Sequence, residues 1–245
     1  MGICREPGSG DIPWSLTKSL TTLFFVVLFC TLLACSRNTS TIQGKVADGK
    51  GLPIADLTVV ATQVVPPGQQ MMATTDTKGA FRFKRLPTSQ QYVILPVSDK
   101  WKTSAKVTVK TGPSSQKYEL PSPLTVRVTL SNDGVITDST SGLQWVPAPG
   151  STMTWFDATR YAETLAIAGG GWRLPTRSEL RGIYDGSYEG HVDPLFLIDR
   201  NWVWTSEILS TEEAWFFSYE NKYEGTHPRQ WLLTRGRILA VRPAR

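Results

Sequence analysis

Few residues in this sequence have side chains that could carry out a reaction. The two histidines, His191 and His227, lie far apart, and no His-x-x-x-His or Cys-x-x-Cys spacing occurs. No Gly-x-Ser-x-Gly, phosphate-loop or dinucleotide-binding pattern is present, and no two acidic residues stand out as a general acid and base. We therefore expect no catalytic residue, no metal site and no cofactor.

Binding chemistry is better represented, in an aromatic-rich stretch between residues 184 and 231. Aromatic faces bind the C–H surfaces of sugars, and guanidinium groups bind sulfate or carboxylate through two parallel hydrogen bonds. The candidate binding residues are Tyr188, Trp202, Trp215, Tyr219, Tyr223, Arg229 and Trp231. They predict a recognition surface for an anionic or neutral glycan. The alternative is that these rings fill the core between strands.

The composition divides the chain into two regions. Of its 245 residues 40% are hydrophobic and 19% charged, which is typical of a globular protein. Residues 36–124 hold 12 Lys and Arg against 5 Asp and Glu, whereas residues 125–245 hold 12 against 14. The second region has 11 arginines and one lysine, and it contains seven of the nine tryptophans. Two domains with different chemistry follow from this contrast.

The N-terminal segment has the pattern of an export signal. Residues 20–34 are apolar and uncharged, and this run is shorter than the roughly 20 residues needed to span a bilayer. It ends in Leu32-Leu33-Ala34-Cys35, which resembles the bacterial lipobox. The resemblance implies a signal peptide over 1–35, acylation of the Cys35 thiol, and an outer-membrane location because Ser36 follows. An ordinary secretory signal with an incidental cysteine, or a membrane anchor, is the alternative. Residues 36–41 then form a polar tether.

Residues 42–120 predict an all-β sandwich. Hydrophobic residues alternate in short runs that Gly, Pro, Asp and Ser clusters separate. The segments GKVADGKGLPIADLTVVA, TTDTKGAFRFKRLP and QYVILP resemble the carboxypeptidase regulatory-like, or transthyretin-like, domain. That resemblance implies a spacer or interaction module. Eight basic residues either face anionic membrane headgroups or form a solvated face: Lys78, Arg82, Lys84, Arg85, Lys100, Lys102, Lys106 and Lys110. Residues 121–124, with two prolines, are the predicted linker.

Residues 125–245 predict two capped helices among antiparallel strands, an α+β arrangement. Thr154 with Asp157 marks one helix start, and Thr176 with Glu179 makes a capping box for the next. Gly169 to Gly171 are expected to end the first helix. A short strand over residues 172–174 follows them.

The second region also carries a family resemblance. The segments DSTSGLQW, TWFDATRYA, GGGWRLPTRSEL, VDPLF, WVWTS and RILAVR are similar, in this order, to the C-terminal domain of the Lcl collagen-like adhesin. The resemblance implies a fold related to the formylglycine-generating-enzyme and C-type-lectin group. It also implies an exported protein that binds extracellular glycan in some members. Sulfatase-activating chemistry needs cysteines, which this region lacks, and lectin-type calcium motifs are missing, so any glycan binding would be calcium-independent.

Most motif residues have a structural interpretation. Trp145, Trp155, Trp172 and Trp204 are expected in or at the rim of the core, with ligand stacking as the alternative. Asp138 is expected to close a turn. Arg173 is expected to form an ion pair with a carboxylate such as Glu179, with a ligand contact as the alternative.

The combined prediction is a cell-envelope lipoprotein, lipid-anchored at Cys35, with a sandwich spacer and a non-catalytic binding domain for a glycan, as in a surface adhesin. The alternative is a structural or scaffolding component of an envelope protein assembly. The expected partners are the membrane and a glycan or envelope protein. No nucleic-acid partner is expected.

Overall fold

The computed structural model describes residues 38–66, 68–148, 153–198, 202–230 and 237–244. Thr39 to Arg245 form one compact unit. The predicted signal peptide, Cys35 and residues 36–37 of the predicted tether fall outside the described residues. The tether prediction is wrong for residues 39–41, because these belong to strand β1 (Thr39–Asp48). No helix in the described ranges is long and apolar enough to cross a membrane.

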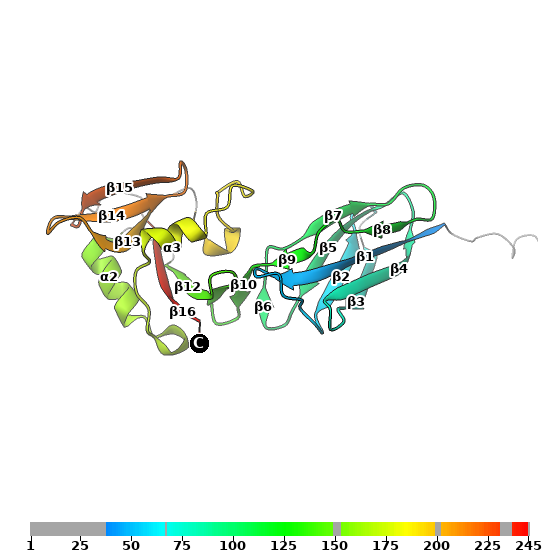
Figure 1. Cartoon of the computed structure of the whole chain (residues 1–245), viewed down its shortest axis with the longest axis horizontal. Coiled ribbons are helices and arrows are strands. Elements are labelled where there is room, and N and C mark those ends of the chain that lie inside the picture. The colour runs from blue at the N-terminus through cyan, green and yellow to red at the C-terminus, as the bar shows by residue number, and fades with distance from the viewer. Residues whose placement is uncertain (1–37, 67, 149–152, 199–201, 231–236, 245) are drawn as a thin grey trace, which may run out of the picture. The chain divides into compact units, whose positions relative to one another are not determined.

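The first region is built from two β-sheets, as its alternating pattern predicts (Figure 1). One sheet has the order β4-β1-β8, with β9 also on β1; its strands are β1 (Thr39–Asp48), β4 (Ala80–Pro87), β8 (Lys117–Glu119) and β9 (Leu124–Val126). The other sheet has the order β3-β2-β5-β7, from β2 (Thr58–Gln63), β3 (Gln70–Thr74), β5 (Gln91–Val97) and β7 (Val107–Lys110). Ile42, Val59, Phe83, Tyr92 and Ile94 pack between the sheets and are buried. We call residues 39–126 the sandwich region.

One turn of the sandwich region shows why the sequence has glycine there. Asp76 begins the turn, and its carboxylate accepts hydrogen bonds from the backbone N–H of Lys78 and Ala80. Gly79 follows with a φ of +70°, and a Cβ atom at this position would lie 2.4 Å from the carbonyl oxygen of Val46. Both the conformation and the space therefore require glycine.

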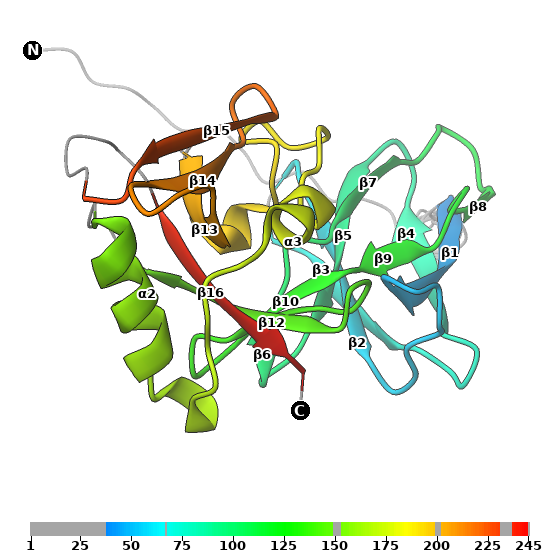
Figure 2. The same ribbon diagram turned by 60° about the vertical axis from the view of Figure 1, so that its left-hand side comes forward.

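The second region, residues 127–244, is called the C-terminal region below. Its larger sheet has the order β16-β12-β11-β10-β6, in which β6 is the short strand Trp101–Lys102, and its smaller sheet has the order β13-β14-β15. The strands are β10 (Val128–Ser131), β11 (Ile136–Asp138), β12 (Leu143–Ala148), β13 (Trp202–Ile208), β14 (Glu213–Ser218), β15 (Tyr223–Pro228) and β16 (Ile238–Pro243). The helices are α2 (Trp155–Thr164) and α3 (Arg177–Gly182), with 3₁₀ turns η1 (Ile167–Gly169) and η2 (Pro194–Phe196). Figure 2 shows α2 beside β16.

Both predicted helix starts are confirmed. The Thr154 side chain accepts a hydrogen bond from the backbone N–H of Asp157, and Thr176 with Glu179 forms the complete capping box. The predicted end of the first helix is wrong. Helix α2 stops at Thr164 because Leu165 is extended. Gly169 is the last residue of the separate 3₁₀ turn η1, Gly170 and Gly171 follow it, and all three glycines have positive φ.

The segment between the helices pairs with the last strand. Arg173 exchanges two backbone hydrogen bonds with Val241, of 3.1 and 2.8 Å. The Arg173 guanidinium forms two hydrogen bonds, of 2.8 and 2.6 Å, with the Glu179 carboxylate. The predicted structural ion pair is confirmed, and it joins Arg173 to the capping box of α3. The predicted strand over residues 172–174 is reduced to the single β-bridge between Arg173 and Val241.

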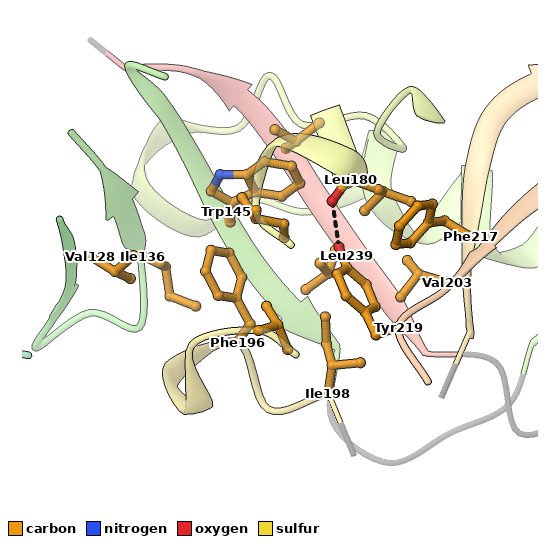
Figure 3. Close-up of a cluster of buried hydrophobic side chains, with 13 residues drawn as sticks. Val128, Ile136, Trp145, Leu180, Phe196, Ile198, Val203, Phe217, Tyr219 and Leu239 are labelled. Carbon is orange, nitrogen blue, oxygen red and sulfur yellow. Dashed lines mark hydrogen bonds between the residues drawn. The ribbon is translucent and has the colours of Figure 1, made fainter. Parts of the chain in front are cut away.

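The main core of the C-terminal region lies between the larger sheet, α3 and η2 (Figure 3). Trp145 is fully buried and makes an edge-to-face contact with Phe196 at 5.8 Å. A second cluster contains Trp172 and Trp204, with Trp155 packed against it half-buried. The four tryptophans therefore lie in or at the rim of the core, as expected.

The two regions exchange strands. Strand β6 (Trp101–Lys102) comes from the predicted sandwich segment but pairs with β10 of the C-terminal region. Strand β9, at the predicted boundary between linker and second domain, pairs with β1 of the sandwich. The domain limits 42–120, 121–124 and 125–245 stay predictions, and the chain links the regions by more than one segment.

Candidate functional site

The most enclosed of the described hollows lies beside Tyr188, where the two regions meet. Its volume is about 220 Å³. It is lined by Thr125, Arg127, Val128, Ile183, Asp185, Tyr188, Asp193 and Phe196. We call it the Tyr188 pocket. Tyr188 also lines two other hollows, both more open than this pocket.

The loop that carries Tyr188 is fixed by its own hydrogen bonds. The Asp185 N–H donates to the carbonyl of His191 at 2.7 Å, and the His191 N–H donates to the carbonyl of Tyr188 at 2.9 Å. The Asp185 carboxylate accepts from the backbone N–H of Ser187 at 2.9 Å. The His191 ring nitrogen Nδ1 is 2.8 Å from the carbonyl oxygen of Tyr219. The loop therefore presents a pre-formed surface.

Three side chains join this loop to the sandwich region. Ser104 donates a hydrogen bond to the buried Asp193 carboxylate, and the Tyr188 hydroxyl donates to the same oxygen at 3.1 Å. The Ser104 and Tyr188 hydroxyls are 3.1 Å apart. Asp193 also accepts from the Leu195 N–H at 3.0 Å, which caps η2. Burial raises the pKa of Tyr188 above its ordinary value, so its hydroxyl stays protonated at neutral pH.

Arg127 also lines the Tyr188 pocket. Its guanidinium forms two hydrogen bonds of 3.0 Å with Asp138 and donates to the carbonyl of Gly182 at 2.6 Å. Burial acts to raise the pKa of Asp138, but the Arg127 hydrogen bonds outweigh it, and the pKa lies below its ordinary value. Asp138 also accepts from Ser141 and from the Thr140 N–H, which confirms its predicted role in a turn.

The charge near the Tyr188 pocket is negative. Asp138 already balances Arg127, while Asp185 and Asp193 line the pocket with no further cation among its lining residues. A hydrogen bond from Ser187 lowers the pKa of Asp185 below its ordinary value, so this carboxyl is ionised at neutral pH. The pocket is suited to hydroxyl donors and repels sulfate or carboxylate groups.

The six predicted binding residues that the structure describes do not form one surface. Tyr219 is fully buried, and its hydroxyl donates to the carbonyl of Leu180 at 3.0 Å (Figure 3), so a ligand contact at Tyr219 is contradicted. Trp202 packs against Trp204 and Phe216 at the rim of the core. Trp215 points to the other face of β14 from Phe216, because side chains alternate along a strand.

The other members lie apart from one another. Trp215 is covered by the Arg177 guanidinium, 4.0 Å from its ring centre. Arg229 stacks on Trp155 and Phe156 at 4.2 Å and donates to the carbonyl of Thr211. Tyr223 is 55% exposed. Trp231 falls outside the described residues. Among the members of the predicted set that the structure describes, only Tyr188 lines the pocket.

Sequence reasoning missed Arg127, Asp185 and Asp193 as members of a site. Asp193 carried a signal, because Asp followed by Pro is a common start of a short helical turn. Nothing in the sequence marked Arg127, because its partner Asp138 is eleven residues away and comes beside it only through the pairing of β10 with β11. Among the residues that the structure describes, no group of three or more His, Cys, Asp or Glu could hold a metal ion.

Comparison with known families agrees with the two regions. Residues 41–131 match the carboxypeptidase regulatory-like domain, and residues 134–242 match the Lcl C-terminal domain. The chain therefore contains a carboxypeptidase regulatory-like domain followed by an Lcl C-terminal domain. The resemblances found in the sequence are confirmed. The first match ends at Ser131, so it includes both β9 and β10.

Two solved structures share weak similarity with the chain. A Pseudomonas aeruginosa protein described as a "putative carbohydrate binding protein" is 17% identical, with 39% of this chain and 93% of that protein covered and a TM-score of 0.27. A C-terminal fragment of the pilus adhesin SpaC from Lactobacillus rhamnosus GG is 12% identical, with 46% and 41% covered and a TM-score of 0.24. These values carry no functional argument. None of the curated proteins compared with the chain matches it.

Proposed function

We propose that this chain is a lipid-anchored protein of the bacterial cell envelope whose C-terminal region binds a neutral glycan without catalysis. The Tyr188 pocket is the proposed binding site. The observation that carries the proposal is the combination, in one pre-formed hollow, of an aromatic ring with hydrogen-bonding groups of Arg127, Asp185 and Thr125. Sugar recognition needs both kinds of group, a flat apolar face and polar groups that fix orientation.

The charges at the pocket favour one of the two glycan classes that the sequence left open. An anionic glycan needs an unpaired arginine, and the arginine at the pocket is already engaged by Asp138. Arg229, the other candidate, is stacked on aromatic rings away from the pocket lining. A neutral glycan, whose hydroxyls donate to Asp185 and accept from Arg127 or Thr125, fits the pocket better.

The carboxyl groups at the pocket favour binding over hydrolysis. Glycoside hydrolysis needs a carboxyl that is protonated at working pH, which requires a raised pKa. The pKa of Asp185 is lowered instead. Asp193 is buried and held by Ser104, Tyr188 and the N–H of Leu195, so it has a structural task. These observations favour binding over the acid catalysis of a glycosidase.

The fold relation and the location also belong to the proposal. The resemblance to the Lcl C-terminal family supports a C-type-lectin-like arrangement of α2, α3 and the antiparallel strands. The Leu-Leu-Ala-Cys sequence supports acylation of Cys35 and attachment to the outer membrane. The proposed fold relation and the proposed anchor are independent of glycan binding at the Tyr188 pocket, so evidence against either one would not contradict the binding.

A glycan array with the intact chain tests the binding function. Tyr188→Ala should reduce binding at least about tenfold, because it removes the ring that faces the sugar. Tyr188→Phe should retain most of the affinity, since it removes only the hydroxyl that Asp193 uses. Tyr223→Ala is the matched control, an exposed tyrosine of the same region that lies away from the pocket lining. Binding should change little between low and high salt, because the ligand is neutral.

The outcome that refutes the proposal also identifies the rival. If the array is silent and crosslinking recovers one envelope protein, the C-terminal region is a docking module in an assembly. Leu197, 62% exposed in the hollow beside Tyr188, supports that second function because it offers an apolar contact. Leu197→Asp should then abolish the crosslink.

A further inference from the structure

The sandwich region has one end that differs from the other in charge. At this end β1 begins, and three loops surround its first residue. Thr39 pairs with Pro87, the last residue of β4, and its N–H donates to the Ser115 hydroxyl between β7 and β8. The loop after β2 joins them, because the Gln63 side chain bonds to Gln90 at 3.1 Å. We call this the entry end, and Figure 1 shows the first residues of β1 there in blue.

The loops of the entry end carry only positive charge, and the nearest acidic residue is Glu119, which lines a hollow together with Lys84 and bonds to the Gln43 side chain. The exposed charged residues of the entry end are Lys84, Arg85, Lys110 and Lys117. No acidic residue occurs in segments 64–66, 84–91 or 110–117. No ion pair within the described part of the chain engages these four side chains.

The opposite end is balanced. All four aspartates of the sandwich region lie there, in the turns that follow β1, precede β2, precede β4 and follow β5: Asp48, Asp56, Asp76 and Asp99. Four lysines accompany them: Lys50, Lys78, Lys100 and Lys102. The basic residues of the sequence therefore do not share one face, and the excess positive charge is concentrated at the entry end.

Apolar side chains are exposed at the same end. Val64 and Val65, in the loop after β2, are 38% and 70% exposed. The Val64 N–H donates to the carbonyl of Gln91, which fixes the base of this loop beside β5. Exposed aliphatic tips surrounded by cations are the combination that binds the interface of an anionic bilayer.

We propose that the entry end rests on the anionic lipid surface that holds the anchor. This inference rests on the proposed acylation of Cys35. Four peptide steps separate Cys35 from Thr39, so an extended chain reaches about 14 Å. The negative surface potential of an anionic bilayer falls off over a Debye length of about 8–10 Å. A tether this short keeps the entry end close to the lipid surface. The positive charges and exposed valines of the entry end then bind that surface and fix the orientation of the sandwich region. The C-terminal region bonds to the opposite end, through Gly49 with Ser139 and Thr140, and is thereby directed away from the lipid.

Hydrogen–deuterium exchange of the acylated full chain in vesicles tests the orientation. The vesicles contain phosphatidylcholine alone or with about 30 mol% phosphatidylglycerol. In the anionic vesicles, amides of residues 84–91 and 111–117 should exchange at least about fivefold more slowly than in the neutral ones. Residues 48–52 and 76–80, at the opposite end, should exchange equally in both.

Two controls assign the effect to the entry-end charges. Replacing Lys84, Arg85, Lys110 and Lys117 by Glu should remove the protection, whereas the same replacement of Lys50, Lys78, Lys100 and Lys102 should leave it. The wild-type chain at about 0.5 M salt should lose it too, without any mutation. Equal exchange in both vesicle types overturns the inference, as does protection produced by a soluble polyanion but not by vesicles.

The mass of the chain separates this failure from failure of the anchor. A chain without the thioether-linked lipid at Cys35, or one that does not float with vesicles, contradicts the proposed location. An acylated, floating chain with no charge-dependent protection contradicts only the orientation.

Discussion

The two regions use positive charge in opposite ways. In the sandwich region the cations are mostly lysines on exposed strand and turn positions, and none forms an ion pair among the described residues. In the C-terminal region every described ion pair uses an arginine, and several arginines also stack on aromatic rings. The arginine bias is therefore structural. Arginine's planar fork holds strands and helix ends together, while the lysines remain available to a surface.

The C-terminal region should lose much of its stability when one buried ion pair is removed. Asp138→Ala leaves Arg127 without its partner and removes the acceptor of Ser141 and the Thr140 N–H. We expect a loss of about 3 kcal/mol in the free energy of unfolding. Urea unfolding followed by tryptophan fluorescence measures it. Lys84→Ala in the sandwich region is the control and should change stability by less than about 0.5 kcal/mol. A loss below about 1 kcal/mol for Asp138→Ala would contradict the structural role of the pair.

The sandwich region should instead be destabilised by a substitution that strains its backbone. Gly79→Ala forces a non-glycine residue to a positive φ and places its Cβ against the Val46 carbonyl. We expect a loss of about 2 kcal/mol. Gly142 of the C-terminal region has the same φ of +70° but open space around its Cβ position. Gly142→Ala should cost about 1 kcal/mol, from backbone strain alone. Equal losses in thermal unfolding would show that the carbonyl contact is unimportant.

Acid should weaken the C-terminal region through its ion pairs. Burial raises the pKa values of Asp138 and Glu179, but hydrogen bonds from Arg127 and Arg173 outweigh it, so both lie below the ordinary values of 3.8 and 4.5. The unfolded chain then binds these protons more readily. The resulting stability is fully present above about pH 5 and is lost as the pH falls through the lowered values.

We expect this loss to be on the order of 1–2 kcal/mol between pH 6 and pH 3. Urea unfolding at several pH values measures it for the wild type and for Asp138→Asn. The difference between the two proteins should shrink toward acid. A difference that is constant with pH would mean that Asp138 acts through packing rather than charge.

The smallest effect tests whether arginine itself matters. Arg177→Lys keeps the charge but removes the fork that pairs with Glu207 and Glu224 and the flat group that covers Trp215. We expect a loss of about 1 kcal/mol. Lys110→Arg, an exposed site of the sandwich region, should be neutral in the same assay. If both substitutions are neutral, the contrast between lysine and arginine has no energetic basis.

Local features of the fold could be predicted from the sequence. Thr154, Thr176 and Glu179 act as caps because the groups they bond lie within one helical turn. The ion pair between Arg173 and Glu179 was also within reach, since both residues belong to one short motif. The end of α2 was not, because Leu165 turns away before the glycines that the pattern suggested.

Long-range pairing explains what could not be predicted. The two residues of β6 carry no pattern that would indicate pairing with β10 instead of with a strand of the sandwich region. The Tyr188 pocket depends on this exchange, because Ser104 comes from the segment after β6. Tyr219 shows the same limit. Its position after β14 looks exposed, yet packing from α3 buries the ring and supplies a carbonyl acceptor for its hydroxyl.

The parallel pairing of β1 also has a mechanical consequence. Strand β1 runs parallel to β8 over its first half and to β9 over its second half. A tension applied between Thr39 and the C-terminal region enters β1 at its first residue and β9 at its last. The hydrogen bonds between these strands lie across the line of pull, so they are sheared together instead of being peeled apart one by one. We expect a sandwich held in this geometry to withstand drag from flowing liquid better than one whose end strands unzip.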